Sequence, residues 1–167
     1  MNSKITSLTA AIILALGIAV SATMTGCKRN SAPSQETLDA IAALRKIQAG
    51  TQVGINYQEY GKLLIEAKAK VNDATRSLPE GELKTQITGA MDSYADAATV
   101  WGVKIKDRDL YADSEPGKTL IAKYGLAVEK PSYGDPRADS DKALQVVWLS
   151  ADIYLIRIET LLKQTGK

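Results

Sequence analysis

The residues whose spacing most suggests chemistry are residues 112–119, ADSEPGKT. They match a loose phosphate-loop pattern, in which a small residue and four variable residues precede Gly-Lys-Thr. Such a loop holds phosphate with backbone N–H groups between a buried strand and a helix, and no strand pattern precedes this stretch. Asp113 and Glu115 would repel phosphate, and Pro116 lacks an N–H. We therefore predict no nucleotide binding and interpret Pro116 as the start of a short helix that Gly125 ends.

The residue inventory excludes several other chemistries. The chain has no His and a single Cys, so Ser-His-Asp triads, Glu-x-x-His di-metal sites and Cys-x-x-Cys-His haem attachment are all excluded. Residues 135–141, DPRADSD, are rich in carboxylates but lack the glycine and final Glu of an EF-hand loop. We expect them to cap the last helix rather than bind calcium. No cofactor or metal is expected, although Ser-Lys or carboxylate-pair catalysis stays open.

Composition indicates one folded domain without affinity for nucleic acid. The 167 residues are 45% hydrophobic and 24% charged, as is usual for a globular protein. Their 21 basic and 19 acidic residues are spread along the chain and give a net charge of only +2. No basic stripe with interleaved aromatic residues is present, so nucleic acid is not an expected partner.

The first residues have the pattern of an export signal. Lys4 precedes an apolar run at residues 8–20, LTAAIILALGIAV, and small residues follow. This order is typical of a secretory signal peptide. The run is also shorter than the roughly 20 residues that a membrane-spanning helix needs. The alternative is a buried N-terminal helix, which would need a core that covers it on every side.

Residues 24–27, MTGC, resemble the lipobox of bacterial lipoproteins, with Met24 where Leu is most frequent. The resemblance implies that residues 1–26 are removed and that Cys27 carries a diacylglycerol. Ordinary signal-peptide cleavage after Ala22, with Cys27 left as a free thiol, is the alternative. A lipidated cysteine better explains a lone Cys in an oxidising compartment. The resemblance covers the signal and Cys27 only.

Lipidation would make the protein membrane-anchored. Lys28 rather than Asp follows the cysteine, which in enteric bacteria resembles the pattern sent onward to the outer membrane. We therefore expect an outer-membrane anchor and a domain that faces the periplasm. Residues 27–34 would form the lipidated cysteine and a short polar tether. Residues 35–167 would form the folded domain.

That domain is predicted to be all-α, an elongated antiparallel up-down bundle of three to four helices. Apolar residues recur at helical spacing in residues 35–49, 53–78, 83–105 and 139–164, and no strand pattern is seen. Gly50 and Gly54 leave open whether the helix at 35–49 continues into 51–78.

Two further expectations concern packing. Residues 53–78 and 83–105 fit one another as a helical hairpin, in which Tyr60 faces Trp101. The apolar arc of residues 139–164 is broad, which predicts burial of that helix against two neighbours.

Two features are candidates for function. One is the long connection at residues 107–138, which carries Tyr111, Tyr124 and Tyr133 among Pro and Gly. The other is the aromatic set that includes Tyr60 and Trp101, which could line a ligand pocket instead of forming ordinary core.

The leading hypothesis is a non-enzymatic, membrane-anchored envelope lipoprotein, an accessory or scaffold that binds another envelope protein. The alternatives are a helical bundle that binds a small apolar ligand as carrier or sensor, and an unrecognised hydrolase. The tentative partner or ligand surface consists of Tyr60, Trp101, Tyr111, Tyr124 and Tyr133.

Overall fold

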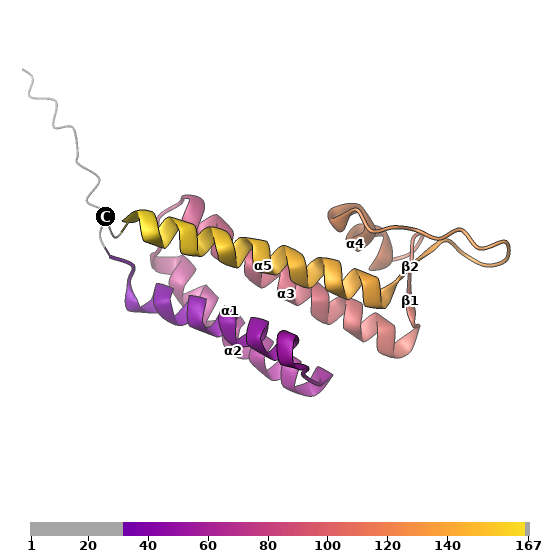
Figure 1. Ribbon diagram of the computed structural model, residues 1–167, viewed down its shortest axis with the longest axis horizontal. Coiled ribbons are helices and arrows are strands. Elements are labelled where there is room, and N and C mark those ends of the chain that lie inside the picture. Colours follow the sequence, from indigo (N-terminus) through magenta and orange to yellow (C-terminus); the bar gives the residue numbers. More distant parts are fainter. Residues whose placement is uncertain (1–31, 166–167) are drawn as a thin grey trace, which may run out of the picture.

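The computed structural model describes residues 32–165, which form five helices and one small antiparallel sheet (Figure 1). The elements in chain order are α1 Gln35–Val53, α2 Tyr57–Ser77, α3 Glu82–Lys106, β1 Asp109–Tyr111, α4 Gly117–Tyr124, β2 Arg137–Asp139 and α5 Ser140–Thr165. The predicted all-α class is confirmed in its coarse form, since the described chain is mostly helical. The expected signal peptide and Cys27 lie outside the described residues.

The four long helices lie alongside one another in two closely packed pairs. α1 packs along α2, and α3 packs along α5. The two pairs are joined where α2 packs on α3. In Figure 1 the start of α1 and the end of α5 lie together at one end of the molecule. The short elements β1, α4 and β2 lie at the opposite end. We call these the proximal and distal ends.

The chain breaks between α1 and α2 and does not form one continuous helix. Gly54 follows α1 with φ of 92°, a backbone conformation that favours glycine. Asn56 then caps α2, because its side-chain oxygen accepts a hydrogen bond from the Glu59 N–H at 2.9 Å. Val53, predicted to begin the stripe of the second helix, instead ends α1 and is 86% exposed. The sequence pattern misplaced Val53 because Val53 keeps the four-residue spacing to Tyr57, although the helix ends between them.

Small residues allow α3 and α5 to approach closely. A Cβ atom on Gly89 of α3 would lie 2.5 Å from Cε1 of Tyr154 on α5, so the tyrosine ring occupies the space that a side chain would take. Two further small residues meet here, since the hydroxyl oxygens of Ser93 on α3 and Ser150 on α5 lie 3.5 Å apart. The absence of larger side chains therefore sets the distance between these two helices.

The expectation that the chain has no strands was wrong. β1 and β2 pair antiparallel, with Leu110 opposite Ala138 and both side chains buried. Each strand has three residues, too few for a recognisable alternating pattern. The expected cap of the last helix is confirmed, since the Lys142 N–H donates to Oδ1 of Asp139 at 2.9 Å.

α5 has the two predicted neighbours, since it packs chiefly on α3 and to a smaller extent on α1, but one side of its broad apolar arc is covered by neither. Four aliphatic side chains on that side remain open to solvent: Val146 (41% exposed), Leu149 (60%), Ile153 (44%) and Ile156 (60%). We call these four residues the α5 stripe. α5 packs chiefly on α3, and within residues 32–165 no element covers the stripe.

The close approach of α3 and α5 can be tested at Gly89. Gly89→Ala should lower the free energy of unfolding by about 1–3 kcal/mol, because the added methyl group overpacks the contact with Tyr154. Gly61→Ala on α2 is the matched control, since a methyl group added there would meet open space. It should stabilise by about 0.5–1 kcal/mol through helix propensity. Urea unfolding followed by circular dichroism measures both, and equal effects would contradict the packing argument.

Candidate functional site

The predicted contact between Tyr60 and Trp101 is confirmed. Their ring centroids are 5.5 Å apart, and Trp101 also lies 5.7 Å from Tyr57 and 5.7 Å from Trp148. We call these four residues the aromatic cluster. It joins α2, α3 and α5 near the distal ends of these helices, so one predicted layer of the α2–α3 hairpin is present.

Tyr60 is a core residue in this cluster. Its side chain is fully buried, and its hydroxyl donates a hydrogen bond to the backbone oxygen of Tyr94 at 2.8 Å. Burial raises the pKa of Tyr60 above its ordinary value, so the hydroxyl stays neutral at physiological pH. Because the ring has no exposed surface, a ligand could not touch Tyr60 without opening the core.

Tyr124 has a different role, since it ties α4 to α3. Its hydroxyl donates to Oδ2 of Asp96 at 2.7 Å, and Lys123 Nζ pairs with the same oxygen at 2.6 Å. Burial raises the pKa of Tyr124 to about 12, and the neighbouring carboxylate raises the pKa of Lys123. The shared carboxylate of Asp96 therefore holds α4 in a fixed position on α3.

The other two candidate tyrosines lie apart from both groups. Tyr111 is in β1, paired with Arg137 of β2. Tyr133 lies in the connection between α4 and β2 and is 94% exposed. The five predicted residues therefore do not form one site. Tyr60 is in the core and the partly buried Trp101 packs against it. Tyr124 and Tyr111 hold the distal end together, and of the five only Tyr133 is fully presented to solvent.

The Gly-Lys-Thr sequence has a structural explanation. α4 begins at Gly117 after Pro116 and ends before Gly125, whose φ is 61°, as predicted. A Cβ atom on Gly117 would collide with the backbone carbonyl of Tyr111, so packing against β1 requires this glycine. The Thr119 N–H donates to the Glu115 carboxylate at 3.3 Å, in the first turn where a phosphate loop would bind its anion.

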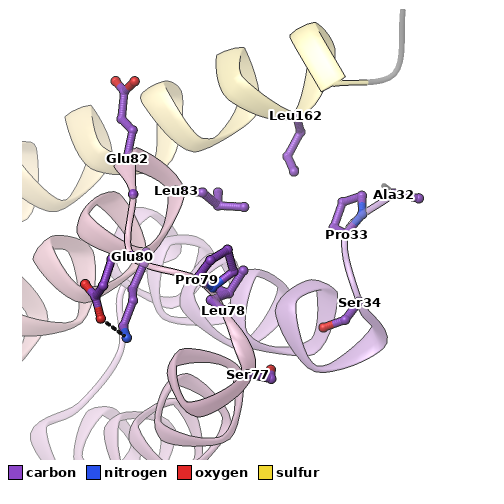
Figure 2. A pocket seen from close by; sticks show the side chains of 12 residues that line it. Ala32, Pro33, Ser34, Ser77, Leu78, Pro79, Glu80, Glu82, Leu83 and Leu162 are labelled. Atoms are coloured by element: carbon purple, nitrogen blue, oxygen red, sulfur yellow. Dashed lines mark hydrogen bonds and ion pairs between the residues drawn. The ribbon is translucent and has the colours of Figure 1, made fainter. Parts of the chain in front are cut away.

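A pocket at the proximal end was missed by the sequence reasoning (Figure 2). It has a volume of about 470 Å³ and lies between the residues that precede α1, the α2–α3 turn and the end of α5. Figure 2 shows its apolar side chains, namely Pro33, Leu78, Pro79, Leu83 and Leu162. We call it the proximal pocket. Its lining comes from three segments that are distant in sequence, so no local pattern could have indicated it.

Charged groups lie on one side of the proximal pocket, away from the polar Ser34 that also lines it (Figure 2). Glu80, Glu82 and Lys84 line it, and Lys84 pairs with Glu80 at 2.6 Å. The pocket therefore combines an apolar floor with a charged rim, an arrangement suited to a ligand that has an apolar part and a polar end.

The described part of the chain has neither a metal-binding cluster nor a helix suited to span a membrane. Residues 32–165 contain no cluster of three or more His, Cys, Asp or Glu side chains placed to hold a metal ion. Within the same residues, no helix combines the length and the hydropathy required to cross a membrane.

The structural role of Tyr60 gives a direct prediction. Tyr60→Phe should lower the free energy of unfolding by about 1 kcal/mol, because the buried hydrogen bond to the Tyr94 carbonyl is lost. Tyr133→Phe removes a hydroxyl from a fully exposed ring and should change stability by less than about 0.5 kcal/mol. Chemical unfolding of the two variants measures the difference. An unchanged free energy of unfolding in Tyr60→Phe would show that the hydroxyl does not support the core.

The chain was compared with protein-family models, with curated proteins and with solved structures, and none of them matches. Function must therefore be argued from the residues of the chain and their arrangement.

Proposed function

We propose that the protein is a non-enzymatic accessory or scaffold of the bacterial envelope, lipid-anchored through Cys27, that binds another envelope protein. The observation that carries the proposal is the separation of its two ends. The described chain begins at the proximal end, and the connection between α3 and α5, which contains Tyr133, lies at the distal end (Figure 1).

This arrangement would hold the distal end well away from a membrane. Ala32 follows Cys27 by only five residues, so a lipid on Cys27 would place the membrane next to the proximal end. α5 has 26 residues and is about 39 Å long, and it runs from the distal end to the proximal end. We regard the long helices as an elongated up-down bundle that acts as a spacer between the outer membrane and a periplasmic partner.

The distal end is both rigidly mounted and exposed at its tip. The pairing of β1 with β2 and the contact of Tyr124 with Asp96 fix its base. Tyr133 extends from this base with its ring open to solvent. An exposed aromatic side chain suits protein binding, because its stiff ring buries a large area at little entropic cost.

Partner binding can be tested by crosslinking in living cells, followed by purification and mass spectrometry. Tyr133→Ala should reduce the recovered partner about tenfold or more, the loss expected when an aromatic anchor is truncated. Far-UV circular dichroism should stay unchanged, because the ring contributes little to the core. Ile65→Ala removes a 74% exposed side chain from α2 and is the matched control, which should retain the partner.

A third variant tests the anchor. Cys27→Ala should remove the lipid, detected as a loss of mass from the mature chain, and should release the protein from the membrane fraction. Wild-type recovery of the partner by Tyr133→Ala would contradict binding through the distal tip. An unmodified Cys27 in the wild-type protein would contradict the anchor.

The proximal pocket favours a second candidate function, the binding of a small apolar ligand. A hollow of about 430 Å³ lined by Tyr57, Lys106 and Asp107 also lies beside the aromatic cluster, but the proximal pocket is the more apolar and the more enclosed of the two. In a lipid-anchored protein this pocket would be adjacent to the membrane, a source of ligands with acyl chains.

Solvent extraction of the purified protein, followed by mass spectrometry, tests this candidate. Leu83→Trp should fill part of the pocket and lower the recovered ligand about fivefold or more, since the larger ring occupies ligand space. Ile65→Trp places the same residue on the exposed face of α2 and should leave the recovery unchanged. If the wild-type extract contains no ligand, the second candidate function, a carrier of small apolar ligands, is excluded.

A further inference from the structure

The α5 stripe has the spacing of a coiled-coil seam. Val146, Leu149, Ile153 and Ile156 follow one another at intervals of three, four and three residues, so they form one continuous line along the helix. All four are exposed, and charged side chains are absent from the line itself. A contiguous apolar surface of this kind commonly marks an interaction site.

The residue types indicate which partner geometry fits. In heptad notation, Val146 and Ile153 occupy a positions, while Leu149 and Ile156 occupy d positions. β-branched residues at a, with leucine at d, favour pairs of parallel helices. Val146, Leu149 and Ile153 follow this rule, and Ile156 at d departs from it. The a and d residues of a parallel pair face their own counterparts, so a second copy of α5 presents a matching surface.

The charges beside the stripe favour the same geometry. Asp152 lies at a g position and Arg157 at the following e position, five residues later. In a parallel pair these positions face each other across the interface, so Asp152 of each copy meets Arg157 of the other. An antiparallel pair would bring g positions together and place Asp152 against Asp152. Charge complementarity therefore selects the parallel arrangement.

The hydrogen bonds of these residues leave them able to pair. Oδ1 of Asp152 accepts a hydrogen bond from the Gln48 side chain at 2.9 Å, which orients the carboxylate beside α1. Arg157 is exposed, and within residues 32–165 it forms no ion pair. The other g-position carboxylate, Glu159, is already paired with Arg45 of α1. The opposite charge that Arg157 lacks in the monomer is supplied by Asp152 of a second copy.

We propose that the α5 stripe is the interface of a parallel homodimer. Four aliphatic side chains that are each already about half covered offer far less area than the roughly 800 Å² per partner of a standard stable interface. The dimer is therefore weak in dilute solution and forms when copies are concentrated. If the proposed lipid anchor holds, it supplies that concentration and gives both copies the same orientation.

Thiol crosslinking of the full-length protein in cell membranes tests the dimer and its direction. Thr160 continues the a positions beyond Ile153, and Thr160→Cys places a thiol there. With bis-maleimidoethane, a parallel pair should yield a covalent dimer, because the two introduced thiols face each other. In the antiparallel pair that aligns the same four apolar layers, Thr160 faces Lys142 and the two thiols are about 27 Å apart.

Two chains serve as controls in the same experiment. Ile65→Cys exposes a thiol on α2, away from the stripe, and should give at least fivefold less dimer than Thr160→Cys. The wild-type chain reports any crosslinking through Cys27 itself.

Leu149→Glu, combined with Thr160→Cys, should abolish the dimer because it places two carboxylates in the seam. The Leu149 side chain is 60% exposed, so the monomer with Leu149→Glu should keep its circular dichroism spectrum.

Charge reversal tests the contact between the copies. In the Thr160→Cys background, Arg157→Asp should lower the crosslinked fraction about threefold or more, since attraction becomes repulsion. Asp152→Arg should do the same. The chain that carries both reversals should regain the dimer, which a merely structural role of either residue would not explain.

The outcomes separate the possible occupants of the stripe. Crosslinked dimers from Thr160→Cys with rescue by the double reversal support the proposal. Crosslinking only in mixtures of Lys142→Cys and Thr160→Cys chains would overturn it in favour of antiparallel pairing. Crosslinking of the Thr160→Cys thiol to a different protein would also overturn it. So would a dimer yield from Ile65→Cys equal to that from Thr160→Cys. In a Cys27→Ala chain at raised concentration, dimer should persist, which keeps this test independent of the anchor.

Discussion

The close packing of α3 against α5 is the contact on which the other features depend. Gly89 and the facing serines Ser93 and Ser150 let the two helices approach, and Tyr154 fills the space beside Gly89. α3 then provides Trp101 to the aromatic cluster and Asp96 to the base of the distal end. Because α5 packs one side of its apolar arc on α3, the other side stays open as the α5 stripe.

The features that sequence reasoning predicted correctly depend on local chemistry. Pro116 and Gly125 bound α4, and Asp139 caps α5, because a proline, a glycine or a capping carboxylate acts within a few residues of its own position. The contact of Tyr60 with Trp101 was also predictable, because α2 and α3 are joined by a short turn that fixes which layers face each other.

The features that were missed depend on segments distant in sequence. The pairing of β1 with β2 needs residues 109–111 to meet residues 137–139, and three-residue strands carry no periodic signal. The proximal pocket combines three separate segments. The apolar arc of α5 shows the same limit: a helical pattern shows which residues are apolar, but the residues alone do not reveal whether a neighbouring element covers them.

The two proposals have a joint geometric consequence. In a parallel dimer both distal ends point in the same direction, so two Tyr133 side chains would be presented together on one side. An antiparallel dimer would place them at opposite ends. A periplasmic partner with two equivalent sites would then bind a parallel dimer with an effective concentration set by the distance between the tips, which strengthens binding without any new contact. Weak contacts at Tyr133 and at the α5 stripe would support each other, since a bivalent partner holds two copies side by side and a dimer presents two tips at once.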